Sequence, residues 1–222
     1  MLEQEHLVWK QEGAKNASER SQKNLQDKLK AAGLKLPLYP TPQIIERART
    51  VMGRIDYDPT SDPVQQVLVD ATSVPSVDTN PLKEHWHGNV FVSPKGAVRT
   101  TRMWLNKTVD EYRNHHINSF IFFTSASEIM RAAPVIMDYP FCIPFKRVKQ
   151  LRATPKGFES VCPSTWNIII YGPPNEMAIT SVDKVALFHD TFRDIGRICY
   201  NDFAGDSWQR DLDYYNEKRG EI

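Results

Sequence analysis

The chain alternates between segments with apolar residues at helical spacing and short, continuous apolar runs. In "QIIERARTVMG" the apolar positions fit one face of a helix: Ile44, Ile45, Ala48, Val51 and Met52. Gly53 then predicts the end of that helix, because glycine tolerates the left-handed conformation that follows many helices. "DPVQQVLVDA" predicts a second helix, since Asp caps helix N-termini and Pro suits the first turn. "TTRMWLNKTVDEYRNH" predicts a third, with one side formed by Met103, Trp104, Thr108 and Tyr112.

The apolar runs between these helices predict strands. "NVFV" is one such run and stops at the Ser-Pro of "NVFVSPKGA", and "INSFIFFTS" has the continuous apolar character of a strand buried on both faces. "IDYDP", "APVIMDYPFCIPF", "RVKQL" and "STWNIIIYG" predict further strands. Helices that alternate with apolar strands indicate an α/β fold, in which helices cover the faces of a sheet.

Polarity and proline content divide the chain into three parts. Residues 1–35 are charged and rich in helix formers, with apolar positions too sparse for a core helix, so we expect a helical N-terminal arm there. The Pro-rich connector "LPLYPTP" opens a central domain over residues 36–175. After Pro173 and Pro174 come an amphipathic segment, "VDKVALFHDTFRDIGRICY", and a polar end, which together predict a helical C-terminal extension over residues 176–222.

Composition argues against several classes of protein. The 222 residues are 41% hydrophobic and 25% charged, as in ordinary globular proteins. No apolar run reaches the roughly 18 residues that a membrane-spanning helix needs, and the N-terminus lacks the basic-then-apolar pattern of a secretory signal. The three cysteines, Cys142, Cys162 and Cys199, are odd in number and far apart, which argues against a disulfide framework and favours a reducing cytoplasm.

Two histidine pairs raise the question of a metal site. They are His85 and His87 in "HWH", and His115 and His116 in "NHH". Neither pair has the i, i+4 spacing of a helical zinc motif, and no pair of cysteines accompanies them. The sequence therefore predicts no metal, with Trp86 packed under a strand and the flanking histidines in a loop.

Four short segments follow one another within residues 39–96: "YPTPQIIERARTVMG", "IDYDPTSD", "NPLKEHWHGNVFV" and "SPKG", in a similarity that runs to about residue 172. As an ordered set they resemble the phage-type DNA adenine (N-6) methyltransferase family. The first is similar to the family's Thr-Pro and the helix after it, and the second to its Asp-Pro-Ala-Ser signature. The third matches the Leu, the Trp and the small residue that lead into the catalytic strand. "SPKG" stands where the family carries Asn-Pro-Pro-Tyr.

This resemblance implies a Rossmann-like S-adenosylmethionine-dependent methyltransferase fold, and methyl transfer to the exocyclic amine of adenine in DNA. It also implies a phage-encoded protein that works in the host cytoplasm, in the context of restriction and modification. The residues implied to hold S-adenosylmethionine are Thr41, Pro42, Asp56, Asp58 and Ser61. Carboxylates at the end of a strand can accept hydrogen bonds from the donor's ribose hydroxyls or methionine amine. Alternatively, "DPTSDP" only turns the chain and caps the next helix.

The loop after the catalytic strand receives the amine of a flipped adenine in this family. Here Ser93 offers a hydroxyl acceptor and Pro94 offers its carbonyl, so the resemblance makes these two the catalytic residues. Lys95 replaces the second proline, and its ammonium can only donate hydrogen bonds. Gly96 replaces the aromatic residue, whose stacking on a base is worth about 1–3 kcal/mol.

Three functions stay open after this departure from the family pattern. In the first, the protein methylates adenine with a remodelled loop and uses a nearby aromatic side chain, such as Phe91, Trp104 or Phe123. In the second, it is a catalytically inactive protein of the same fold that binds nucleic acid or a host partner, in defence against restriction or in genome handling. In the third, the cofactor pocket serves a different methyl acceptor.

Two basic runs stand out in a chain whose formal net charge is +1, namely "KGAVRTTR" and "PFKRVKQLRATPKG". The first begins in the SPKG loop, and the second falls where the resemblance expects the strand that encloses the target base. Basic side chains at these places can neutralise DNA phosphates without reading sequence. The candidates for this contact are Lys95, Arg99, Arg102, Lys146 and Arg147. Alternatively, each run is a solvated face.

Overall fold

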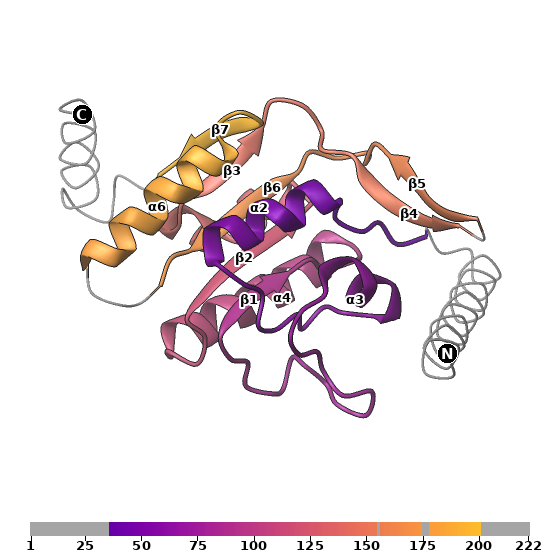
Figure 1. Ribbon diagram of the computed structural model, residues 1–222, viewed down its shortest axis with the longest axis horizontal. Coiled ribbons are helices and arrows are strands. Elements are labelled where there is room, and N and C mark those ends of the chain that lie inside the picture. The colour runs from indigo at the N-terminus through magenta and orange to yellow at the C-terminus, as the bar shows by residue number, and fades with distance from the viewer. Residues whose placement is uncertain (1–35, 155, 175–177, 201–222) are drawn as a thin grey trace, which may run out of the picture.

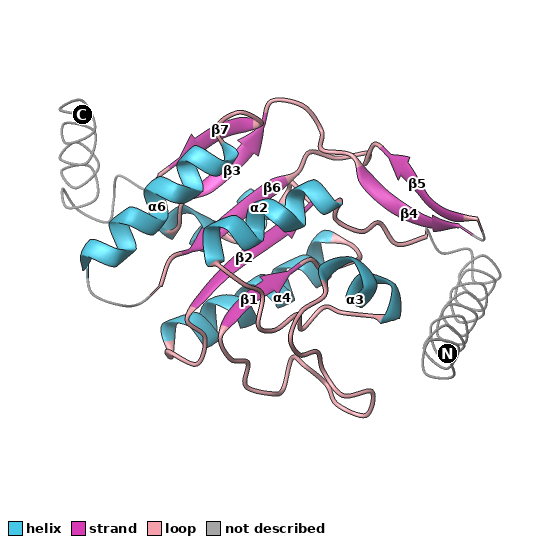
Figure 2. Ribbon diagram, in the orientation of Figure 1, coloured by secondary structure: helices cyan, strands magenta, loops and turns pink. Residues whose placement is uncertain are grey.

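The computed structural model describes residues 36–154, 156–174 and 178–200, which form a layered α/β structure with a separate β-hairpin (Figures 1 and 2). The N-terminal arm expected at residues 1–35 and the polar end at residues 201–222 lie outside these ranges. Within the described ranges, no helix combines the length and the apolar character that crossing a membrane requires.

One five-stranded sheet organises the described chain. Its strands, in spatial order, are β1 (Asn89–Val92), β2 (Ser119–Thr124), β6 (Ile168–Gly172), β3 (Phe141–Pro144) and β7 (Gly196–Cys199). β1 and β2 are parallel, whereas the pairings of β2 with β6, β6 with β3, and β3 with β7 are antiparallel. Because β6 runs against both of its neighbours, β1, β2 and β3 point the same way and end at the same edge of the sheet.

Helices cover both faces of this sheet, as the alternation of elements predicts. In chain order they are α2 (Pro42–Met52), α3 (Pro63–Val69), α4 (Val98–Arg113), α5 (Ile129–Ala132), the 3₁₀-helix η1 (Pro134–Asp138) and α6 (Ala178–Phe192). α2 ends before Gly53 and α3 begins after Asp62, whose carboxylate accepts two first-turn N–H groups; the sequence predicts both. On α4, Thr108 is buried and Trp104 and Tyr112 pack against the core, whereas Met103 is half exposed and Leu105 is buried in addition.

Alternating side chains of the sheet supply two cores, one on each face. In β2, Ile121 and Phe123 pack in the cluster that contains the buried residues of α2 and α6. Phe120 and Phe122 pack on the other face, in the cluster that contains residues of α4, α5 and η1. All of β2 is buried, which confirms that "INSFIFFTS" is a strand covered on both faces.

The second half of the sheet departs from the predicted elements. The apolar run "APVIMD" forms η1, which begins at Pro134, and the strand β3 begins only at Phe141. The end of "RVKQL" starts β4 (Gln150–Thr154), which pairs with β5 (Gly157–Val161) in the separate hairpin. β5 is mostly exposed, so no apolar pattern marks it in the sequence. "IDYDP" contributes only an isolated pair of bridges at Tyr57.

Residues 178–200 belong to the same layered unit as residues 36–174, which differs from the division that the sequence predicts at residue 175. α6 shares a core with α2, and β7 pairs with β3 at the edge of the sheet. The predicted helix ends at Phe192, and the chain then enters the sheet at Gly196. A side chain has no room at Gly196, because its Cβ atom would lie 2.5 Å from the Sγ atom of Cys142. The central domain therefore continues through residue 200.

Candidate functional site

The connections on either side of the Tyr57–β1 pair lead to opposite sides of the sheet. Tyr57 forms parallel bridges to Ser73 on one side and to Val90 of β1 on the other. After Tyr57 the chain passes through α3 to Ser73, away from β1, whereas after β1 it passes through α4 to β2 on the opposite side. In open α/β sheets, ligands bind beyond the carboxyl ends of the strands at such a switch point. Residues 58–62 and 93–97 follow these two carboxyl ends.

A buried polar cluster occupies this position, with Asp58 at its centre. Asp58 is fully buried, and its Oδ1 accepts hydrogen bonds from the backbone N–H (3.0 Å) and the hydroxyl (2.7 Å) of Thr60. Its Oδ2 accepts a hydrogen bond from Nε2 of Gln65 (2.7 Å). Burial raises the pKa of Asp58, while the hydrogen bonds from Gln65 and Thr60 and the charge of Lys95 act to lower it. The chain itself thus uses three of the roughly four lone-pair positions of this carboxylate.

Thr60 joins this turn to the SPKG loop. Its hydroxyl oxygen accepts a hydrogen bond from the backbone N–H of Ser93 (2.9 Å), and its carbonyl accepts one from Nζ of Lys95 (2.9 Å). Ser93 is only 3% exposed, and Pro94 follows it out of the carboxyl end of β1. Two of the four segments that carry the resemblance are therefore in direct contact.

Lys95 is partly buried in the site. Its Nζ forms an ion pair with Oδ2 of Asp62 (2.9 Å) and lies 5.0 Å from the centre of the Tyr39 ring. The Tyr39 hydroxyl donates to the same carboxylate oxygen (3.3 Å), while the other oxygen of Asp62 caps α3. The ammonium that the sequence assigns to a DNA phosphate is thus paired inside the protein.

Asp56 has a different position from Asp58. Its Oδ2 accepts a hydrogen bond from the backbone N–H of Asn89 (2.8 Å), the first residue of β1, and its Oδ1 forms an ion pair with Nε of Arg54 (2.6 Å). The carboxylate of Asp56 therefore lies at the opposite end of β1 from Ser93, where it fixes the start of the strand.

The remaining residues assigned to the cofactor lie on the segments that flank the cluster. Thr41 is the N-cap residue of α2 and is buried, whereas Pro42, the first residue of the helix, is exposed. The connector reaches the polar cluster through Tyr39, which also pairs with β4. The N–H of Ser61 donates to the carbonyl of Asp58 (3.2 Å) and closes the turn before α3.

The basic side chains assigned to phosphates fall into two further groups. Arg99 and Arg102 are exposed on the first turns of α4, directly after the SPKG loop. Lys146 and Arg147 are exposed after β3, where Arg147 donates to the carbonyl of Pro163 (2.9 Å). Among the described residues, no side chain caps the N-terminus of α4 and its first turn carries no acidic residue. Its N–H groups and nearby arginines therefore favour a bound anion.

Three residues of the cluster are ones that the sequence pattern does not single out. Thr60 lies inside "IDYDPTSD" but is a small polar residue in a turn, and Tyr39 lies in an irregular connector. Gln65 is three residues after the capping Asp62, where a Gln often returns to the helix N-terminus. Here its amide nitrogen binds Asp58, and its buried Oε1 has no hydrogen-bond partner in the described part of the chain.

The aromatic residues considered as substitutes for the missing ring lie in the cores. Phe91 and Phe123 are fully buried, and Trp104 stacks on Trp86 with ring centres 6.1 Å apart. Phe91 and Phe123 therefore cannot stack on a base without leaving the core. Gly96 has a φ of +124°, so a tyrosine at this position would be strained.

Comparison of the chain with protein-family models, with curated proteins and with solved structures found no match. The function of the site is therefore inferred from its geometry and chemistry. Those features are a switch point in the sheet, a buried carboxylate that accepts three hydrogen bonds, a partly buried ion pair and a proline-containing loop after β1.

Proposed function

We propose that this protein has a Rossmann-like methyltransferase fold and transfers a methyl group from S-adenosylmethionine to the exocyclic amine of adenine in DNA. The observation that carries the proposal is the hydrogen bond between Thr60 of the "IDYDPTSD" turn and Ser93 of the SPKG loop. The resemblance assigns the first segment to the methyl donor and the second to the target amine. Their contact at the switch point supports a single site for both substrates.

Ser93 and Pro94 act on the target amine in this proposal. Their oxygens accept its hydrogen bonds, which weakens the delocalisation of the nitrogen lone pair into the ring. The nitrogen then forms a bond to the methyl carbon as the carbon–sulfur bond breaks, the sulfonium leaves as a neutral thioether, and the amine proton passes to water. Because Ser93 is almost completely buried, only a base flipped out of the duplex would reach it.

The donor side of the site offers one unused acceptor, Oε1 of Gln65, which fits an amine or hydroxyl of the donor. Asp58 supports the Thr60 turn in this proposal, because its hydrogen bonds from Thr60 and Gln65 leave little capacity for a ligand. Asp62 becomes an acceptor for the donor when Lys95 leaves its ion pair. Asp56 braces β1 and acts on the donor only through the position of that strand.

A second function, a catalytically inactive protein that binds nucleic acid, is favoured by the position of Lys95. Its ammonium is held inside the site by Asp62, where it would oppose the positive sulfonium of the methyl donor. Gly96 also has a backbone conformation that disfavours the aromatic residue of the family loop. In this case the exposed Arg99 and Arg102 contact phosphates and no methyl donor binds.

Calorimetric titration with S-adenosylmethionine and S-adenosylhomocysteine, together with an assay of labelled methyl transfer to adenine-containing DNA, separates these functions. Methyl transfer predicts micromolar binding of both nucleosides. Ser93→Ala should lower the transfer rate about tenfold or more with donor affinity unchanged, since it removes an acceptor that acts in the transition state. Ser76→Ala, at an exposed loop position, is the matched control and should leave both quantities unchanged.

Donor binding without transfer to any adenine-containing DNA would reject adenine methylation and leave a different acceptor. If neither nucleoside binds, the enzyme is rejected, and the second function then requires that the protein still bind DNA.

A further inference from the structure

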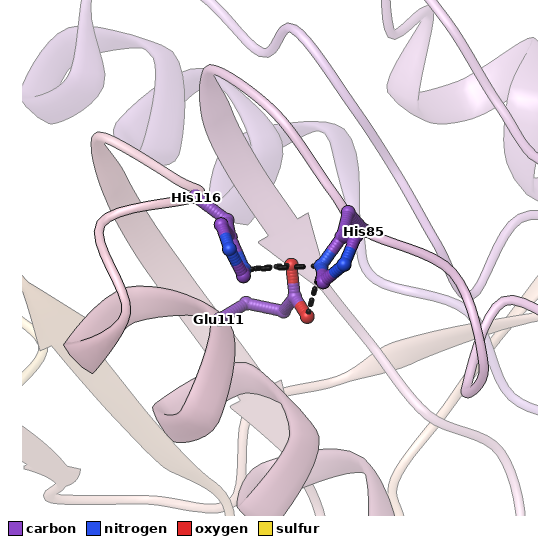
Figure 3. A group of neighbouring side chains, drawn as sticks. All are labelled: His85, Glu111 and His116. Atoms are coloured by element: carbon purple, nitrogen blue, oxygen red, sulfur yellow. Dashed lines mark hydrogen bonds and ion pairs between the residues drawn. The ribbon is translucent and has the colours of Figure 1, made fainter.

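Three side chains from two separate parts of the sequence meet between the loops that lead into β1 and β2 (Figure 3). His85 lies in the loop before β1, Glu111 in the last turn of α4, and His116 in the loop between α4 and β2. Each offers one ligand atom, and these atoms all lie within 4.8 Å of one another. This His85–Glu111–His116 cluster is at the amino ends of the two strands, opposite the SPKG loop, and plays no part in the function proposed above.

The spacing of the ligand atoms suits a small divalent ion. Nδ1 of His116 is 3.1 Å from Nδ1 of His85 and 3.1 Å from Oε2 of Glu111. Nδ1 of His85 is 3.4 Å from Oε1 of Glu111. Ligand atoms bound about 2.0–2.1 Å from a tetrahedral zinc ion lie about 3.3 Å from one another. Figure 3 shows both imidazole rings directed towards the carboxylate.

The donor and acceptor roles of the two Nδ1 atoms depend on the tautomers of the rings. If both facing Nδ1 atoms carried hydrogen, two N–H groups would oppose each other across 3.1 Å, so at least one nitrogen presents a lone pair. The ionised carboxylate of Glu111 adds further lone pairs beside it. When both Nδ1 atoms present lone pairs, three electron-pair donors converge on one region, and one cation can bind all three.

Glu111 is held in a fixed orientation. Its side chain is only 4% exposed, its Oε2 accepts a hydrogen bond from the backbone N–H of Trp86 (2.9 Å), and its Oε1 accepts one from Nζ of Lys107 (2.6 Å). Carboxylates that bind metals are commonly oriented by such hydrogen bonds.

We propose that His85, Glu111 and His116 bind one divalent transition-metal ion of the zinc class, with solvent at the remaining position. Two imidazoles and one carboxylate suit such an ion, whereas Mg²⁺ and Ca²⁺ prefer oxygen ligands. The ion joins the loop before β1 to the end of α4. Lys107 opposes its charge, so the site binds more weakly than the ligand set alone would allow.

Titration of the untagged full chain with Co²⁺, followed by visible absorption, tests the site. One Co²⁺ per chain should bind with the absorption bands of a tetrahedral complex, and Zn²⁺ should displace it. His85→Ala and His116→Ala should each weaken binding about tenfold or more. Both side chains are partly or largely exposed, so the fold should persist, which circular dichroism checks.

His115→Asn is the matched control, because His115 precedes His116 but lies outside the cluster. Its φ of 58° is tolerated by Asn, so this change should leave Co²⁺ affinity as it is. Wild-type binding no tighter than that of His85→Ala and His116→Ala would overturn the proposal, and so would an equal loss in His115→Asn. Neither result depends on whether the protein binds S-adenosylmethionine.

Discussion

Gly88 lets the carboxylate of Asp56 reach the first N–H group of β1. Its φ of +66° is one that glycine adopts without strain, and a Cβ atom at this position would lie 2.6 Å from both Cβ and Oδ2 of Asp56. Both the backbone conformation and the available space therefore require glycine here. Through Asp56, this single residue fixes the strand that carries Ser93 at its other end.

Gly88→Ala should lower the free energy of unfolding by about 2 kcal/mol or more, from backbone strain together with the clash with Asp56. Gly53→Ala is the matched control, because Gly53 also has a positive φ, +84°, but nothing lies within 4 Å of its Cβ position. That change should cost less, because it brings backbone strain without a clash. Urea unfolding of the two variants measures the difference. Equal losses in the free energy of unfolding would show that the clash with Asp56 does not contribute to the cost.

Asp56 and Asp58 show how far sequence reasoning reaches at this scale. Their place in "IDYDPTSD" marks both as candidates for one pocket, but a carboxylate's partners depend on which strand lies beside it. Asp56 meets Asn89 and Asp58 meets Thr60, in contacts set by the register of separate segments. The enclosure of Lys95 by Asp62 depends on tertiary structure in the same way, since a basic run in a sequence looks exposed.

At the scale of elements, α4 connects the two sites. It begins directly after the SPKG loop, with Arg99 and Arg102 exposed on its first turns, and it ends with Glu111 in the proposed metal cluster. Cations at a helix N-terminus are unfavourable to the helix itself, because the N–H groups there already carry partial positive charge. A bound phosphate would remove this conflict.

Replacing both Arg99 and Arg102 with Gln should therefore weaken DNA binding to a similar extent for different base sequences. The slope of log affinity against log salt concentration should become shallower by about 2, roughly 1 for each lost phosphate contact. Fluorescence anisotropy with labelled DNA over a series of salt concentrations gives this slope. Arg131→Gln, at an exposed position of α5, serves as control. An unchanged slope in the double variant would place the phosphate contacts elsewhere.

Elements whose boundaries depend on local chemistry could be predicted, and those that depend on distant partners could not. Gly53 ends α2 and Asp62 with Pro63 begins α3, all through contacts within a few residues. β7 lies in a continuous amphipathic pattern and forms a strand only because β3 offers it an edge. β5 is polar, and its pairing with β4 alone makes it a strand.

At the scale of the whole molecule, α6 closes one face of the sheet and ties the end of the described chain to its beginning. Phe188 is fully buried and stacks on Tyr171 of β6, with ring centres 5.1 Å apart. Arg47 of α2 forms an ion pair with Asp194, just after α6 (2.7 Å). These contacts make residues 178–200 necessary to the core that also contains α2.

Phe188→Ala should accordingly lower the free energy of unfolding by about 3–5 kcal/mol, the usual cost of removing a buried aromatic ring. Leu187→Ala, at the neighbouring half-buried position, should cost clearly less. Chemical denaturation followed by circular dichroism measures both. If Phe188→Ala lowers the free energy of unfolding no more than Leu187→Ala, the result would favour the separate C-terminal extension that the sequence predicts.

β6 lies between β2 and β3, although it follows both of them in the chain. During synthesis, the facing edges of β2 and β3 therefore have no native partner until residues 168–172 have left the ribosome. β2 is buried along its whole length and contains four consecutive apolar residues, and an unpaired apolar edge is a template for other chains. Because β6, the central strand, is synthesised after both of its neighbours, the nascent protein is most vulnerable to aggregation before translation has finished. This gives chaperones a defined interval in which to act.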